Sequence, residues 1–140
     1  MFDIISIVIV FSSLLIFGGL LLFLIDKNKK NNGLNVEKFR TKWLEIENTF
    51  DIKNELSHNM CIIKADSLLD MALKEVGVTG DTMGERLKNS SSKLSKIDSV
   101  WTAHKIRNKL VHEHETKLNT RVTRQVLNTY KQALKDLGAI

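Results

Sequence analysis

Residues 97–113 read IDSVWTAHKIRNKLVHE, and this stretch decides both the fold class and the candidate site. Successive residues of an α-helix turn by about 100°, so each side chain can be placed around a helix axis. With Ile97 at 0°, the polar residues Asp98, Thr102, Lys105 and Lys109 fall at about 80–140°, which is an ordinary solvated face. Most of the remaining arc is apolar. The stretch therefore predicts an amphipathic helix packed against other helices.

Polar residues also fall inside the apolar arc. Arg107 lies at about 280°, His104 at about 340° and Asn108 at about 20°, while His112 lies at about 60°, on the border. An unpaired buried charge is very costly, so Arg107 needs a partner. A structural interpretation pairs it with an acid of an earlier helix and leaves Asn108 and His104 to bind backbone groups. The candidate acids are Asp66 and Asp70.

The rest of the chain predicts an all-α domain, because apolar residues recur every three or four positions and the chain has no proline. Helices are expected over about 36–50 and 54–76. A short third helix should begin at the capping-box pattern Thr82-Met-Gly-Glu85. The fourth helix is expected to begin at a cap, Asp98 or Ser95, and to end near Glu113. Asn119 or Thr120 should cap a last helix.

The spacing of Arg107-Asn108-Lys109-Leu110-Val111-His112 resembles the motif of the HEPN superfamily (higher eukaryotes and prokaryotes nucleotide-binding domains). That motif has an arginine, usually a polar residue after it, and a histidine after four to six intervening residues. The likeness covers roughly residues 36–140, and residues 65–88 fit the earlier helix that often carries an acid facing the arginine. The resemblance implies a four- to five-helix HEPN-like bundle that pairs as a homodimer.

In active members the arginines and histidines of two protomers line one cleft. The resemblance then implies metal-independent RNA cleavage, with His112 as general acid or base and Arg107 stabilising the charged transition state. Asn108 completes the candidate catalytic set, and His104, Asp66 and Asp70 would support it. Arg107 and His112 are about 140° apart on an ideal helix, so one straight helix does not bring them together. A frayed helix end or a second protomer would have to do so.

The first residues differ from the rest. Residues 4–25 read IISIVIVFSSLLIFGGLLLFLI, of which 17 of 22 are Ile, Val, Leu or Phe and none is charged. A helix of this length spans about 33 Å, close to the hydrocarbon thickness of a bilayer. A cleaved signal peptide would have a basic start and a shorter apolar run. We therefore expect a transmembrane anchor over residues 1–25, a basic polar linker over 26–35 and a helical domain over 36–140.

Three lysines, Lys27, Lys29 and Lys30, follow the apolar run. Lysines favour the cytoplasmic side, so this pattern predicts a single-pass protein of the bacterial inner membrane with its N-terminus outside and its C-terminal domain cytoplasmic. The same lysines are candidates for contacts with anionic lipids. The one cysteine, Cys61, excludes an intrachain disulfide and is expected in the core.

No cofactor and no metal is predicted. His112-Glu113-His114-Glu115 lacks the i, i+4 histidine pair of a zinc helix. Basic residues of the last helix region usually form a solvated face but are also candidates to contact RNA phosphates, in particular Lys117, Arg121 and Arg124. Two functions remain open. One is a non-catalytic, membrane-tethered interaction or dimerisation module. The other is a metal-independent RNase of the toxin or defence class.

Overall fold

The computed structural model describes residues 3–30, 33–113 and 117–140, without the side chains of residues 5, 7 and 23–30. In these ranges the regular structure is helical, as predicted. The helices are α1 (Ile4–Lys30), α2 (Val36–Thr49), α3 (Glu55–Glu75), α4 (Met83–Asn89), α5 (Ile97–His112) and α6 (Thr120–Asp136). The chain divides into two compact units, Met1–Gly33 and Leu34–Ile140.

The first unit corrects the predicted membrane anchor. Among the described residues, no helix combines the length and the apolar character needed to cross a bilayer. The prediction used the length and the apolar composition of residues 4–25 alone. In the structure α1 continues past Ile25, through charged residues, to Lys30. The predicted single-pass topology and the inner-membrane location with a cytoplasmic domain are therefore wrong, while contact with a bilayer stays a prediction. The side chains of Lys27, Lys29 and Lys30 lie outside the described part.

Helix starts in the second unit follow local capping chemistry. Asn35, Asn54 and Asn119 each accept a hydrogen bond from a backbone N–H of the first turn of α2, α3 and α6, respectively. The predicted capping box of Thr82 and Glu85 is present at the start of α4. These side chains satisfy N–H groups that have no partner within the helix.

The predicted cap of α5 is wrong. The residue before this helix is Lys96, which makes no side-chain capping bond. Asp98 lies in the first turn instead, where a carboxylate still favours the positive end of the helix dipole. Ser95 is bonded elsewhere, because its N–H and hydroxyl both donate to the carboxylate of Asp136, at 2.8 and 2.7 Å. Ser95 thus joins the loop before α5 to the end of α6.

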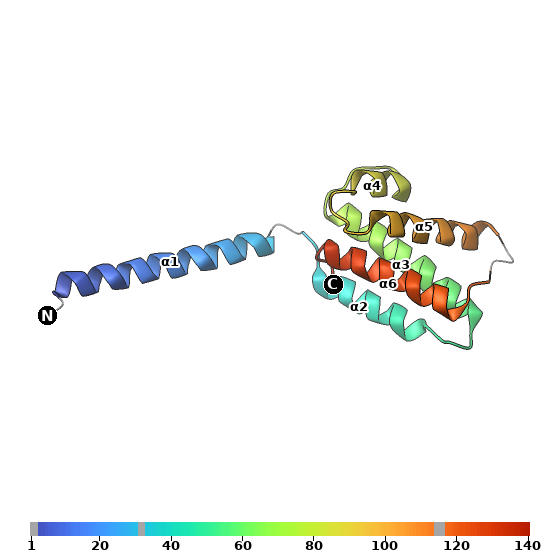
Figure 1. The fold of residues 1–140 in the computed structure, drawn as a ribbon, viewed down its shortest axis with the longest axis horizontal. Coiled ribbons are helices and arrows are strands. Elements are labelled where there is room, and N and C mark those ends of the chain that lie inside the picture. Colours follow the sequence, from blue (N-terminus) through green and yellow to red (C-terminus); the bar gives the residue numbers. More distant parts are fainter. Residues whose placement is uncertain (1–2, 31–32, 114–116) are drawn as a thin grey trace. The chain divides into compact units, whose positions relative to one another are not determined.

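Helix α3 is the centre of the second unit. It packs against α2, α4, α5 and α6, and α5 also packs against α6. Figure 1 shows α3 and α6 running between α2 on one side and α5 on the other. The apolar side chains that these helices share are fully buried and include Phe39, Ile62, Leu69, Leu73, Leu87 and Leu134. Cys61 is buried on α3, as expected, and burial raises the pKa of its thiol.

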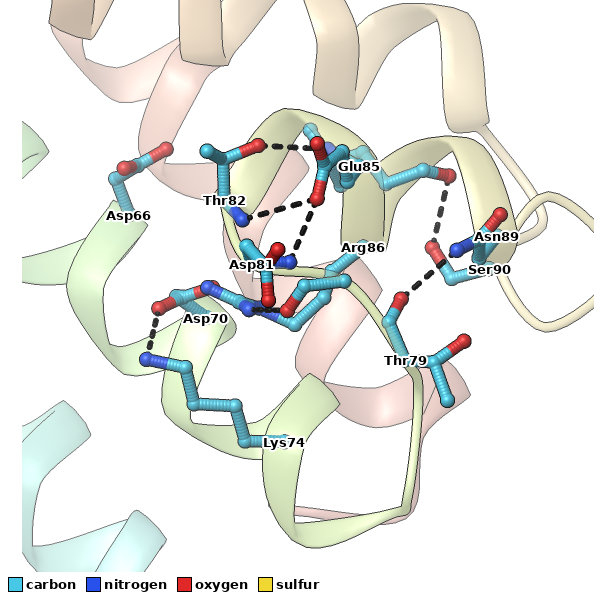
Figure 2. A network of polar contacts seen from close by, with 12 residues as sticks. Asp66, Asp70, Lys74, Thr79, Asp81, Thr82, Glu85, Arg86, Asn89 and Ser90 are labelled. Atoms are coloured by element: carbon cyan, nitrogen blue, oxygen red, sulfur yellow. Dashed lines mark hydrogen bonds and ion pairs between the residues drawn. The ribbon is translucent and has the colours of Figure 1, made fainter.

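The short helix α4 is held to α3 by one buried arginine. Arg86 Nε donates to Asp70 Oδ1 at 2.6 Å, and its Nη1 donates to the carbonyl of Gly80 (Figure 2). Lys74 forms a second ion pair with the same carboxylate, at 2.8 Å. Gly80 has φ +146°, and an added Cβ would lie 2.9 Å from Arg86 N. Glycine is therefore required where this loop closes over the arginine.

Candidate functional site

Two of the polar residues that the sequence places on the inner face of α5, His104 and Arg107, meet at one buried carboxylate, Asp66 of α3. Tyr130 of α6 donates its hydroxyl to Asp66 Oδ1 at 2.9 Å. His104 Nδ1 of α5 lies 2.8 Å from the same oxygen. The side chains of Asp66, His104 and Tyr130 are buried. One carboxylate thus joins the three helices α3, α5 and α6 from within the bundle.

The proton positions in this network follow from its arginine. Arg107 only donates, so the atom of Asn108 that faces Arg107 Nη1 at 3.0 Å must be the amide oxygen. The amide nitrogen of Asn108 then faces His104 Nε2 at 3.2 Å and donates to it. Because Nε2 accepts, the ring proton sits on Nδ1 and is donated to Asp66. These hydrogen bonds fix His104 in the tautomer that carries a proton on Nδ1.

Arg107 completes the set as the ion-pair partner of Asp66. Its Nε lies 3.4 Å from Asp66 Oδ2. This distance satisfies an ion pair, but the geometry is not that of a hydrogen bond, and Nε is buried without a hydrogen-bond acceptor. The side chain is 28% exposed, so the guanidinium lies at the edge of the core and not within it. Of the two acids proposed from the sequence, Asp66 faces this arginine.

Asp70 serves a different arginine. Its carboxylate binds Arg86 and Lys74, as described above. Partial burial would raise the pKa of Asp70, but the hydrogen bonds from Arg86 and Lys74 outweigh this effect and hold the pKa below its usual value. Burial raises the pKa of Tyr130, and the negative charge of Asp66 raises it further, so the phenol is a donor throughout the working pH range. Tyr130 and Asp66 therefore form a fixed donor–acceptor pair.

A groove of about 360 Å³ opens beside this network, between α3, α4 and α5. It is lined by Asp66, Ser67, Asp70, Met71, Lys74, Met83, His104 and Arg107. Both acids of the groove are already engaged by cations, which leaves no free carboxylate for a metal ion or a general base. Among the described residues no group of three or more His, Cys, Asp or Glu side chains could hold a metal.

His112 is not part of the network. It is the last residue of α5 and is exposed. The helix remains regular between Arg107 and His112, so the two side chains stay about 140° apart around the axis. The structure thus joins Arg107, Asn108, His104 and Asp66, and leaves His112 outside. His114 and Glu115, the other half of the discounted metal motif, lie outside the described residues.

The candidate phosphate contacts lie on exposed surface. Lys117 forms an exposed ion pair with Glu55, at 3.4 Å. Arg121 is exposed on the first turn of α6, and the guanidinium of Arg124 lies 5.7 Å from the centre of the Phe50 ring. These three residues do not contact the Asp66 network.

Tyr130 was assigned no role from the sequence. A buried tyrosine usually finds a partner for its hydroxyl, and this is the signal that could have identified it. Arg86 was also missed, because nothing in its local sequence sets it apart from the neighbouring exposed lysine and glutamate.

Comparison with known proteins adds no assignment: no protein-family model, curated protein or solved structure matches this chain. The likeness to the HEPN superfamily therefore rests on the motif residues alone.

Proposed function

We propose that the unit Leu34–Ile140 is a non-catalytic, HEPN-like interaction module that pairs with a second copy of itself. In this proposal Arg107, Asn108 and His104 hold the fold together. The main observation is that the motif residues bind other residues of the same bundle. The guanidinium of Arg107 is bound to Asp66 and Asn108, and Asn108 is bound to His104. His112 contacts none of them, so the motif residues are not arranged around a shared substrate position within one chain.

An apolar strip on α3 supports pairing. The helix is surrounded by neighbours, yet its one open side carries Leu56, Met60, Ile63, Ser67 and Met71, which we call the α3 strip. Leu56 is 78% exposed and Met60 49% exposed. A groove of about 270 Å³ between α2 and α3 lies along one side of the strip, and the groove beside Arg107 lies along the other. Ser67 and Met71 line both grooves.

A second copy is the occupant that fits this surface. Two α3 strips that cross about a two-fold axis present the same ridge and the same pair of grooves to each other, as an isologous contact requires. The small side chain of Ser67 lies in the strip between Ile63 and Met71 and permits close approach of two helices. A unit of this size also buries less of its surface than a larger domain, so shared apolar surface adds to its stability.

The test is the molar mass of the unit Leu34–Ile140 in solution, measured by sedimentation equilibrium. We expect a dimer for the unmodified unit and a folded monomer for Met60→Glu, because the change places a charge in the contact. Leu44→Glu is the matched control, since Leu44 is 56% exposed on α2, outside the strip. This variant should remain a dimer. A monomeric unmodified unit, or equal masses for the two variants, would contradict the proposal.

A second candidate function, RNA cleavage at a dimer cleft, is favoured by the position of Arg107. This residue lines the groove that borders the α3 strip, so a two-fold pair across the strip would bring two copies of it towards one interface. His112 is exposed at the end of the same helix, so a partner chain could supply the other groups of a site that contains it.

Cleavage of labelled RNA in the presence of chelator separates the two candidates. The non-catalytic module predicts no cleavage by the unmodified protein. The RNase predicts cleavage that falls by roughly 10²–10⁴ in His112→Ala, the range expected when a general acid or base is lost. Because His112 is exposed, this variant should keep its fold. Cleavage that continues at an unchanged rate in the variant would point to another site or to contamination.

A further inference from the structure

The side of α6 that points away from α3 carries four cations. With the fully buried Tyr130 at 0°, Lys131, Arg124, Lys135 and Arg121 fall between about 100° and 180° around the helix. We call these four residues the basic face. The one acid in α6 is Asp136, and its carboxylate is bound by Ser95 and Gln132. The amides of Gln125, Asn128 and Gln132 lie exposed between the cations.

Little in the fold neutralises this charge. Lys131 is paired with Glu47 of α2, at 2.6 Å. That hydrogen bond is the main cause of the lowered pKa of Glu47, so the acid is ionised and committed to Lys131 at neutral pH. In the described part of the chain, no ion pair engages Arg121, Arg124 or Lys135. A basic patch without internal counter-charges is the electrostatic feature that a site for a polyanionic ligand requires.

The basic face continues into a groove with aromatic walls. A hollow of about 250 Å³ between α2 and α6 is lined by Trp43, Glu47, Phe50, Arg124, Leu127 and Asn128. At its rim the guanidinium of Arg124 lies over the ring of Phe50, 5.7 Å from the ring centre, and Phe50 is half-buried. A guanidinium over an aromatic ring offers a flat surface on which an unpaired base can stack.

An anionic membrane surface fits this face less well. Helices that lie on a membrane present large apolar side chains next to their cations. In α6 the large apolar side chains are buried or half-buried against the bundle, and none is among the exposed ones. Polar amides take the positions between the cations instead. Amides and a stacking surface suit nucleotides better than acyl chains.

We propose that the basic face of α6, together with the rim of the α2–α6 groove, binds the backbone of single-stranded nucleic acid. The row from Arg121 to Lys135 rises about 21 Å along the helix, which suits one strand and not a broad surface. This binding is independent of the pairing proposed above, because α6 turns this face away from α3.

The salt dependence of binding gives the first quantitative test. A single strand that contacts the three unpaired cations should bind with a slope of log K against log salt of about −2.1. That slope corresponds to an affinity loss of about 20-fold between about 50 and 200 mM salt. The probe is a fluorescein-labelled oligouridylate of about 12 nucleotides, titrated with the full chain and followed by fluorescence anisotropy.

The variant for the second test is Arg121→Gln/Arg124→Gln/Lys135→Gln, which removes three cations and spares the pair of Lys131 with Glu47. Glutamine has a helix propensity similar to that of lysine and arginine, so α6 should remain folded. The matched control is Lys64→Gln/Lys105→Gln/Lys109→Gln, which removes the same charge from exposed positions on α3 and α5. Circular dichroism checks that both variants stay helical.

We expect the α6 variant to bind with a slope near zero, because Lys131 stays paired with Glu47, and the control to keep the slope of the unmodified chain. Equal loss in both variants would overturn the proposal, because binding would then follow net charge and not this face. No binding of the oligonucleotide at about 50 mM salt would overturn it too. The proposal would also be overturned if the chain bound phosphatidylserine vesicles more tightly than the oligonucleotide and the α6 variant lost that binding. The basic face would then bind a lipid surface.

Discussion

At the scale of residues, Asp66 connects three helices through one carboxylate. It is a buried carboxylate that accepts from Tyr130 and His104 and pairs with Arg107, so its charge is satisfied from two other helices. Removing one member of such a set leaves the others buried without partners, which costs more than the contact itself contributes. Single substitutions here should therefore act on stability, whatever else the protein does.

Tyr130→Phe tests this directly. The change removes one hydroxyl and keeps the ring, so the packing of α6 is preserved and only the bond to Asp66 is lost. We expect the free energy of unfolding to fall by about 1.5–3 kcal/mol, the range for a hydrogen bond to a charged group. Urea titration followed by circular dichroism measures it. A loss below about 0.5 kcal/mol would show that Asp66 does not depend on this donor.

The sequence identified the inner position of Arg107 but could not choose its partner. Asp66 and Asp70 are four residues apart, which is only about 40° around α3. Both therefore lie on the same side of the helix, and the sequence pattern alone does not distinguish them. Arg86 of α4 binds Asp70, which leaves Asp66 as the partner of Arg107. That contact joins residues 16 apart through a loop whose path the local pattern does not specify. Long-range packing therefore decides the pairing.

At the scale of elements, the helices were predictable and their attachments were only partly so. The apolar periodicity predicted α2, α3, α5 and α6 closely, and the capping box predicted the start of α4. The start of α5 was not predictable from capping residues, because Ser95 is used by Asp136 across the fold. A side chain that can cap a helix can equally bind a distant acid, and only the tertiary structure settles which it does.

The attachment of α4 should depend on pH. The pKa of Asp70 is lowered in the folded state. The contribution of Asp70 to stability is therefore complete above its pKa in the unfolded chain, about 3.9, and is lost as the pH falls through its pKa in the folded protein. Asp70→Asn should therefore cost about 1–3 kcal/mol at pH 7 and much less at about pH 3. Urea unfolding at both pH values measures the difference.

Asp81→Asn is the control for this prediction, because Asp81 is exposed in the loop before α4. Its effect should stay within about 0.5 kcal/mol at either pH. If Asp70→Asn cost the same at pH 3 as at pH 7, ionisation of Asp70 would not be what holds α4 in place.

At the scale of the whole molecule, the second unit has its own core and its own polar network. All the contacts described for the Asp66 network and for α4 lie within Leu34–Ile140. A fragment that begins at Leu34 should therefore fold by itself, with a strongly helical circular dichroism spectrum and one cooperative thermal transition. A disordered fragment would show that the unit depends on residues before Leu34.

The central claim, that the polar residues of α5 form one inward network fixed on Asp66, is tested most directly by the tautomer of His104. Long-range ¹H–¹⁵N NMR spectra of the protein at pH 7 distinguish a protonated Nδ1 from a protonated Nε2. The network predicts that Nδ1 of His104 carries the proton and Nε2 accepts from Asn108, while exposed His112 exchanges between tautomers. A His104 ring with Nε2 protonated, or one that averages between tautomers as His112 does, would contradict the claim.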